Sequence, residues 1–389
     1  MTPRRLAVAA VVVAMATVLA VIEINATRGG GTVSPSPSAS ATASVTSSAT
    51  ASASASTPSA VPSPTQASGV RPDALHGLIV ATGGLRTEDG DRSLQNPSLF
   101  ATAPTSAYAV SPDGRRVALV RTAQGGQELV TFSTARPNDI AIVHDFSGSG
   151  EVAGHLVWAG DGAESVLVQV EKHTRAEGGG DNLIVEYSAL RAIDVTTHQV
   201  REIARVSGQN NSLWPLAWLP GRQGTQLAGA LEVRPLGPVG NYILVRNNSI
   251  ERTPMSPSPS VASFNASRDG TRVLMFTPTF VRWWPFDQPQ SAKDLPAQSG
   301  ELLSRAEFRP GTDEIGVDRP NPSGQFEVWT LTGQRRVVAT RVTGFVHWRV
   351  DGTAAIAAPG KDALVLIDAA TGALAPVPGP SPIADVVLF

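Results

Sequence analysis

One short pattern recurs along most of the chain and constrains its fold more than any other feature. A short apolar segment is followed by a turn rich in Pro, Asp and Gly and then by a second apolar segment, most completely at residues 107–120. Pro fixes φ and Gly readily adopts positive φ, so Pro112-Asp113-Gly114 predicts a tight reversal between two strands. Degenerate copies follow at residues 156–162, 216–221, 264–270, 306–311 and 346–352.

The spacing of the copies predicts an all-β, radially repeated fold. Their turn residues, at positions 113, 161, 221, 269, 311 and 351, are 40 to 60 residues apart. A repeat of ~40–45 residues is typical of a four-stranded propeller blade. Third strands are expected at 129–132, 192–196, 281–284, 328–333 and 364–372, and fourth strands follow, as at 140–143, 200–203 and 336–338. Sheets this small bury both faces only by stacking on one another, so we predict a β-propeller.

The two ends of this region predict how the ring closes. Residues 383–389 resemble a first strand and end with Phe389 at the position held earlier by Trp158, Trp218, Phe308 and Trp348. The turn and second strand that should come next are found instead at residues 71–83. We therefore expect the C-terminal strand to complete a blade begun by residues 71–102, which gives seven four-stranded blades. Six blades with an N-terminal plug is the alternative.

The best copy of the repeat also carries a family resemblance. Residues 111–118, with the sequence SPDGRRVA, resemble the TolB-type, WD-like β-propeller repeat of exported bacterial proteins. The resemblance covers residues 71–389, although the Asp-Gly pair is lost at Gly221 and Gly311. It implies the propeller architecture and carries no catalytic residue, so it does not assign a function.

The N-terminal segment predicts export. Arg4 and Arg5 precede an apolar run at residues 6–22, which Glu23 ends, as in a signal peptide or a short membrane anchor within residues 1–26. The arginines are expected to stay cytoplasmic and the rest of the chain to lie outside. Residues 27–70 are almost entirely Ser, Ala, Thr, Pro and Gly, which predicts a disordered linker before a propeller domain at residues 71–389.

Composition excludes several functional classes. The chain has no cysteine, which rules out disulfides, thiolate metal sites and a cysteine nucleophile. Its formal net charge of −2 argues against a general nucleic-acid binder, which needs a basic field to attract phosphates.

Residue types that could act in catalysis or bind a metal do not form a recognisable motif in the sequence. The histidines have no metal-ligand spacing, and no Gly-x-Ser-x-Gly motif occurs. The acidic cluster Glu88-Asp89-Gly90-Asp91 and the glycine run Gly178-Gly179-Gly180-Asp181 are better interpreted as a hairpin turn and a mobile loop than as calcium or phosphate sites. We therefore predict no catalytic, cofactor-binding or metal-binding residue and no cofactor. The histidines are His76, His144, His155, His173, His198 and His347.

Two features remain as candidates for recognition. Trp283 and Trp284 are adjacent in a predicted strand, so their side chains should point to opposite faces. One can pack between blades while the other faces outward, where it could stack on a sugar or a peptide, and packing alone is the alternative. The predicted inner strands are mostly apolar, with Asn265, Arg309, His347 and Arg349 as exceptions.

These observations favour one function over another without assigning a ligand. We expect a non-enzymatic binding or scaffolding propeller whose partner is a protein, a peptide or a glycan, not nucleic acid. It is expected to be monomeric and held at the membrane by its N-terminal segment, or secreted if that segment is cleaved. The alternative is an exported lyase, glycosidase or cyclase that uses acidic groups in the central channel.

Overall fold

A computed structural model describes most of the repeat region. The chain divides into two compact units, residues 1–63 and 64–389, and the described residues all lie in the second. The predicted anchor, the linker, His76, the 88–91 and 178–181 segments and Phe389 lie outside them. The described ranges are 77–80, 84–87, 108–123, 126–134, 136–175, 183–208, 211–221, 225–233, 240–255, 262–320, 324–342, 344, 347–360, 363–377 and 386–388.

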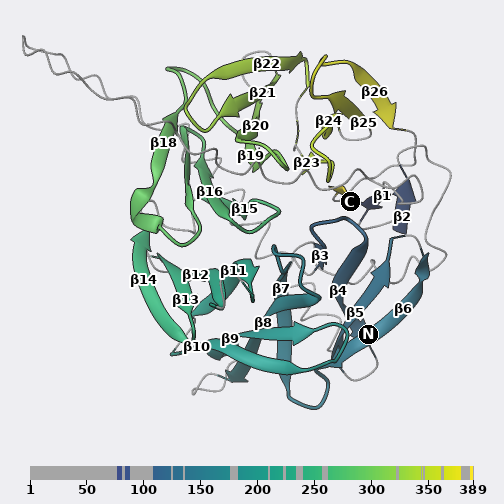
Figure 1. Ribbon diagram of the computed structural model, residues 1–389, viewed down its shortest axis with the longest axis vertical. Coiled ribbons are helices and arrows are strands. Elements are labelled where there is room, and N and C mark those ends of the chain that lie inside the picture. The colour runs from purple at the N-terminus through teal and green to yellow at the C-terminus, as the bar shows by residue number, and fades with distance from the viewer. Residues whose placement is uncertain are drawn as a thin grey trace, which may run out of the picture. The chain divides into compact units, whose positions relative to one another are not determined.

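The strands form a ring of small antiparallel sheets, which confirms the predicted β-propeller (Figure 1). Six sheets have four strands each, connected in sequence from the inside of the ring to the outside. The first comprises β3 (Tyr108–Val110), β4 (Arg116–Ala123), β5 (Gly126–Ser133) and β6 (Arg136–Asp145). The second comprises β7 (Glu151–Trp158), β8 (Ser165–Arg175), β9 (Leu183–Asp194) and β10 (Val200–Ser207).

The remaining four-stranded sheets repeat this order. One comprises β11 (Ser212–Leu219), β12 (Leu227–Val233), β13 (Gly240–Arg246) and β14 (Ser249–Met255). The next comprises β15 (Ser263–Ala266), β16 (Arg272–Thr277), β17 (Phe280–Pro285) and β18 (Lys293–Pro296), with a short 3-10 turn, η2 (Pro289–Ser291), before β18. It is followed by β19 (Arg305–Phe308), β20 (Glu314–Arg319), β21 (Gln325–Thr330) and β22 (Arg335–Thr340). The last comprises β23 (His347–Trp348), β24 (Ala354–Gly360), β25 (Ala363–Asp368) and β26 (Leu374–Val377).

The seventh sheet closes the ring from both ends of the domain, as predicted. Strand β27 (Val386–Leu388) pairs antiparallel with β1 (Gly77–Val80), and β1 pairs with β2 (Gly84–Thr87). Ile79 lies opposite Val387 in this register. The ring therefore has seven sheets, and the seventh contains three strands within the described residues, where a fourth was expected.

The Asp-Gly turns explain why the repeat folds in this way. The Ser111 hydroxyl donates to Asp113 Oδ1 at 2.6 Å, and the backbone N–H of Arg115 donates to the same oxygen at 3.1 Å. Gly114 follows with a φ of 72°, which a residue with a side chain rarely adopts. The Ser267–Asp269 turn repeats the hydroxyl contact at 2.5 Å.

Large aromatic side chains pack between neighbouring sheets. The positions before the turns are buried as predicted, at Trp158, Trp218, Phe308 and Trp348. Trp218 on β11 donates its indole N–H to the Ser165 hydroxyl on β8, in the preceding sheet, at 3.0 Å. The Trp348 ring on β23 lies against Gly316 on β20, where an added Cβ would come within 2.8 Å of the indole. These aromatics therefore form the core between sheets. Among the described residues no helix is long and apolar enough to cross a bilayer.

Candidate functional site

The polar residues of the inner strands link one sheet to the next. Asn265 at β15 donates from Nδ2 to the carbonyl of Ala306 on β19 at 2.6 Å. Arg309 donates from Nε to the carbonyl of Gly352, in the following sheet, at 2.8 Å, and pairs with Glu314 at 2.5 Å. Asn265 and Arg309 therefore join neighbouring sheets.

His347 belongs to a charged cluster that includes two residues not singled out from the sequence. Its Nδ1 lies 3.0 Å from Glu307 Oε2, and its Nε2 lies 2.9 Å from Arg305 Nη2. A guanidinium can only donate, so Nε2 accepts and Nδ1 carries the proton. Burial raises the pKa of Glu307, but His347, Arg305 and Arg268 outweigh it and lower the pKa overall. A carboxylate thus orients the imidazole, while Arg305 occupies the nitrogen that would otherwise act as a base.

A register argument could have found Glu307. It precedes Phe308 at the inner-strand position where His347 precedes Trp348 and Asn265 precedes Ala266. The same position is Ala109 on β3 and Ala217 on β11. The polar side chains therefore occupy three consecutive inner strands.

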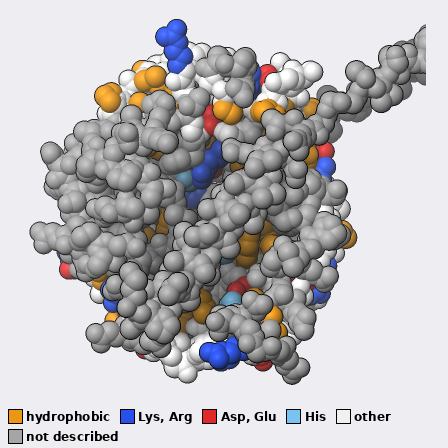
Figure 2. Space-filling model, turned by 180° about the vertical axis from the view of Figure 1, so that it is seen from behind, with side chains coloured by type: hydrophobic (Ala, Val, Ile, Leu, Met, Phe, Trp, Pro, Cys, Tyr) orange, Lys and Arg blue, Asp and Glu red, His pale blue; other side chains and the backbone are white. Residues whose placement is uncertain are grey.

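Arg268 extends this charged cluster across the ring. Its Nη2 donates to the carbonyl of Ser111, next to β3, in a weak contact of 3.5 Å. Burial lowers its pKa to about 10, against the favourable charges of Glu307 and Asp113. Seen from behind in Figure 2, Lys or Arg side chains and a His side chain gather near the middle of the face.

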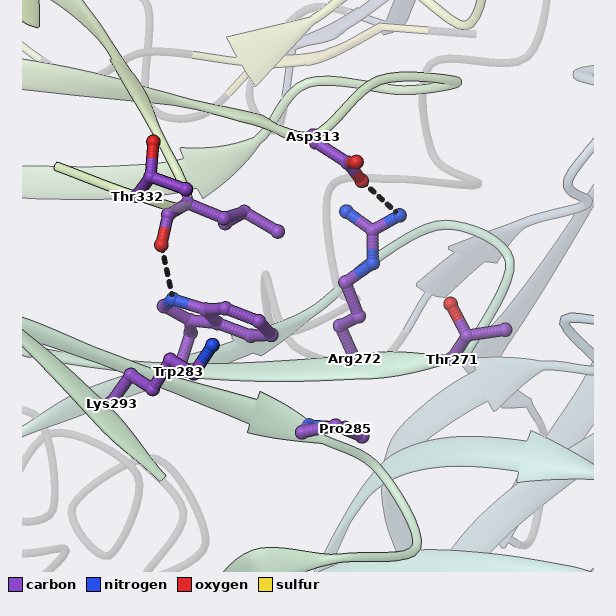
Figure 3. Close-up of a pocket in the computed structure, with 8 residues that line it drawn as sticks. Thr271, Arg272, Trp283, Pro285, Lys293, Asp313 and Thr332 are labelled. Carbon is purple, nitrogen blue, oxygen red and sulfur yellow. Dashed lines mark hydrogen bonds and ion pairs between the residues drawn. The ribbon is translucent and has the colours of Figure 1, made fainter. Parts of the chain in front are cut away.

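A groove of about 350 Å³ opens between two neighbouring sheets (Figure 3). One wall comes from β16, β17 and β18, and the other comes from the turns that follow β19 and β21. Turns from separate sheets meet here, so no local sequence pattern predicts the groove. Its lining residues are Thr271, Arg272, Trp283, Pro285, Lys293, Asp313, Leu331 and Thr332.

The two adjacent tryptophans divide as the alternation predicts. Trp284 is 1% exposed and meets the Tyr242 ring edge-on, whereas Trp283 is half-buried and lines the groove. The Trp283 indole N–H donates to the carbonyl of Leu331 at 3.3 Å, and Lys293 Nζ lies 5.3 Å from the ring centroid. These contacts hold the ring in one plane (Figure 3).

The two cations of the groove, Arg272 and Lys293, differ in their ion pairing. Arg272 pairs with Asp313 at 2.9 Å and donates to the carbonyl of Thr312 at 3.0 Å. Lys293 is exposed, and within the described part of the chain its ammonium has no recorded hydrogen bond or ion pair. The groove thus combines a fixed aromatic face, hydroxyl groups and an ammonium that is accessible to a ligand.

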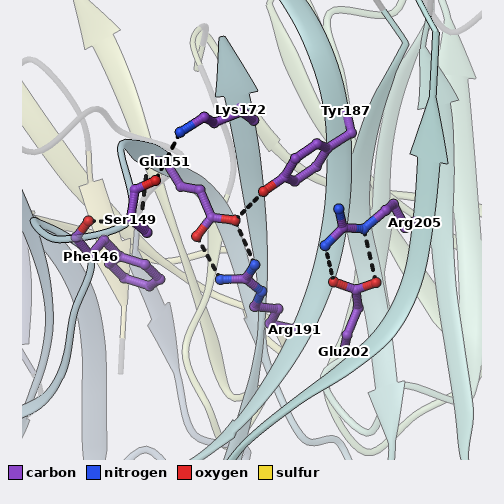
Figure 4. A network of polar contacts seen from close by, with 8 residues as sticks. All are labelled: Phe146, Ser149, Glu151, Lys172, Tyr187, Arg191, Glu202 and Arg205. Carbon is purple, nitrogen blue, oxygen red and sulfur yellow. Dashed lines mark hydrogen bonds and ion pairs between the residues drawn. The ribbon is translucent and has the colours of Figure 1, made fainter.

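A further polar network stabilises the sheet β7–β10 (Figure 4). The Arg191 guanidinium contacts both oxygens of Glu151, at 2.5 and 2.7 Å, and the Tyr187 hydroxyl donates to Oε1 at 2.5 Å. Burial raises the pKa of Glu151, but the hydrogen bonds from Arg191 and Tyr187 lower it overall. Its carboxylate is therefore already satisfied within the fold.

The described histidines are spread over several sheets, in line with the scattered sequence positions. His155 stacks on Trp214 with ring centroids 4.8 Å apart, and His144 meets Phe146 edge-on. His173 pairs with Glu171 at 3.1 Å. Among the described residues no three His, Cys, Asp or Glu side chains are grouped so that they could hold a metal ion.

Comparison with known proteins identifies a class of fold. No family model and no curated protein matches the sequence. Similar solved structures include an oligogalacturonate lyase from Vibrio parahaemolyticus, with 9% identity, a TM-score of 0.50 and coverage of 71% of this chain and 77% of that chain. A Bacteroides fragilis protein assigned as a 6-phosphogluconolactonase has 10% identity, a TM-score of 0.50 and coverage of 82% and 99%.

TolB from Acinetobacter baumannii also matches, with 13% identity, a TM-score of 0.44 and coverage of 73% of this chain and 66% of that chain. The first two structures are β-propellers, in agreement with the ring of sheets in this chain, so the predicted β-propeller fold is confirmed. Identities this low establish the fold class and no function.

Proposed function

We propose that this protein is a non-enzymatic binding propeller that recognises its partner through the groove between the sheets β15–β18 and β19–β22. The observation that carries the proposal is Trp283, a half-buried indole fixed at the wall of an open groove. Aromatic rings of this kind provide a large contact area at low entropic cost. The inner-strand cluster also favours binding over catalysis, because Arg305 lies 2.9 Å from Nε2 of His347, the nitrogen that a general base would need.

Removing the indole tests this proposal. Full-length protein and its Trp283→Ala variant are compared for binding to immobilised peptide and glycan panels. Trp214→Ala is the matched control, because Trp214 is also half-buried but stacks on His155 in another part of the ring. Binding that is lost only in Trp283→Ala supports the groove as the binding site. Equal binding by the unmodified protein and both variants contradicts it.

We also propose that the propeller acts outside the cytoplasm. The proposal rests on the basic residues Arg4 and Arg5, the apolar run 6–22 and the polar linker 27–70. Protease added to intact cells should cut the linker and release the propeller. A full-length chain that becomes accessible only after lysis would contradict an external location.

A second candidate function follows from the Glu307–His347 pair. A carboxylate that lies 3.0 Å from Nδ1 of a histidine and so orients the ring is an arrangement used in general base catalysis. For this role Arg305 must move away from Nε2 when substrate binds. If the protein is an enzyme, His347→Gln abolishes turnover and leaves the fold intact. Activity that is unchanged in this variant excludes the pair as the catalytic group.

A further inference from the structure

The size of the groove restricts what can occupy it. A volume of about 350 Å³ lies at the small end of the range of roughly 300–1,000 Å³ for small-molecule sites. The groove can hold one or two ring-sized groups, not a folded surface. Its occupant is therefore a small molecule or a unit of a chain that runs along the surface.

The walls of the groove offer side chains rather than backbone for recognition. Strand β17 pairs with β16 on one side and with β18 on the other, and Trp283 lies opposite Leu274 and Lys293 in these ladders. Addition of a peptide strand needs an unpaired sheet edge. β17 has none, because the outer edge of this sheet lies at β18, so a ligand stacked on Trp283 itself is bound by side chains, as a saccharide is.

The aromatic wall suits a sugar ring. Trp283 presents a plane that its hydrogen bond to the Leu331 carbonyl already fixes, so little rotamer freedom is lost on binding. Thr271 and Thr332 line the same groove and carry hydroxyl groups, which contact Asp269 and Thr330 within the fold, and Asp313 is 81% exposed. A flat apolar surface flanked by groups that hydrogen-bond hydroxyls matches the two chemical faces of a pyranose.

The charge of the groove indicates that the sugar is acidic. Arg272 already faces Asp313, and nearby Arg282 holds Asp294 through contacts of 2.5 and 2.7 Å. Lys293 is the remaining cation at the groove, and its ammonium lies over the indole ring, 5.3 Å from the ring centroid. An anion carried by a ring stacked on Trp283 would therefore meet Lys293.

Resting on the function proposed above, we propose that the groove binds an acidic saccharide, with the sugar ring stacked on Trp283 and its carboxylate paired with Lys293. The hydroxyl groups of the sugar face Thr271, Thr332 and Asp313. The site thereby distinguishes a charged sugar from a neutral one by one ion pair.

The test compares two probes that differ only at C6, where one has a carboxylate and the other a hydroxymethyl group. Full-length protein is titrated calorimetrically with a glucuronic acid oligomer and with a glucose oligomer of the same length and linkage. Trp283→Ala should weaken binding of the acidic oligomer about tenfold or more, as expected for an aromatic anchor. Lys293→Gln should weaken it about fivefold and leave the glucose oligomer unchanged, in line with a partly exposed charged contact. Lys172→Gln, on β8 in another sheet, is the control for loss of a lysine charge away from the groove.

The outcomes separate this inference from the proposed function. Preference for the acidic oligomer that depends on both Trp283 and Lys293, and that weakens with added salt, supports it. Equal binding of both oligomers, or binding that is insensitive to Lys293→Gln, overturns the acidic class while the groove remains a binding site. Peptide binding that depends on Trp283 without any saccharide binding overturns the inference but retains the proposed function. Binding that is unaffected in Trp283→Ala overturns both. Lys293 is exposed, so its variant keeps the test valid if Trp283→Ala fails to fold.

Discussion

Gly316→Ala tests directly whether the aromatic side chains join neighbouring sheets. An added Cβ at Gly316 would lie 2.8 Å from Cζ2 and Nε1 of Trp348 and 2.9 Å from Cε2. All three atoms belong to one rigid ring, so this clash cannot be relieved by rotating the end of a flexible side chain. Overpacking of a filled core typically costs about 1–3 kcal/mol. The loss of chain entropy in the unfolded state offsets about 0.4–1 kcal/mol of that cost.

We therefore expect Gly316→Ala to lower the free energy of unfolding by about 1–2 kcal/mol, the balance of these two effects. Gly148→Ala is the matched control, because Gly148 is exposed and an added Cβ meets nothing within 4 Å. Urea denaturation followed by tryptophan fluorescence measures both. In a Trp348→Leu background the penalty of Gly316→Ala should shrink. Equal stability of the two glycine variants, or a penalty unchanged in that background, would refute the packing of Trp348 against β20.

Three further substitutions probe other parts of the account. Burial raises the pKa of the Asp318 carboxyl from 3.8 to about 6. Its contribution to the stability of the folded state is therefore fully present below pH 3.8 and is lost as the pH rises through about 6. Asp318→Asn should therefore raise the free energy of unfolding at pH 8 by up to about 3 kcal/mol, and the melting temperature with it, and should change both little at pH 3.5. Thermal melts at the two pH values check this. Tyr242→Phe removes a buried 2.8 Å hydrogen bond to the Phe286 carbonyl and should cost about 1–2 kcal/mol in urea denaturation; no loss would contradict this bond. Arg191→Met leaves the buried Glu151 carboxylate without its cation and should cost about 3–5 kcal/mol by the same measurement, whereas a cost below that of Tyr242→Phe would contradict a buried pair.

The sequence predicted the ring because its signals are local. Asp113 and Gly114 specify a turn through one side-chain acceptor and one positive φ, and both act within a few residues. The aromatic positions then mark the buried side of each inner strand. Strand alternation likewise predicted that Trp283 and Trp284 would separate.

The sites were less predictable because they depend on how sheets meet. Arg272 and Asp313 are 41 positions apart and face one another only after two sheets pack. The contact of Arg268 with the Ser111 carbonyl joins residues 157 positions apart across the ring. A search for histidine and carboxylate spacing along the chain could not find such pairs. Alignment of the inner strands, in contrast, places Glu307 and His347 at one level.

The closure of the ring by both ends of the domain is the claim on which the architecture depends, and an engineered disulfide tests it most directly. Ile79 and Val387 lie opposite one another in the β1–β27 ladder, at a spacing that suits a disulfide. The chain has no cysteine, so Ile79→Cys with Val387→Cys introduces the only thiols. Ile79→Cys with Ile142→Cys, which places the second thiol at an exposed position on β6, is the control. Mass spectrometry after mild oxidation should detect an intramolecular disulfide in the first pair and not in the second. Free thiols in the first pair, or crosslinks only between molecules, would contradict the closed ring.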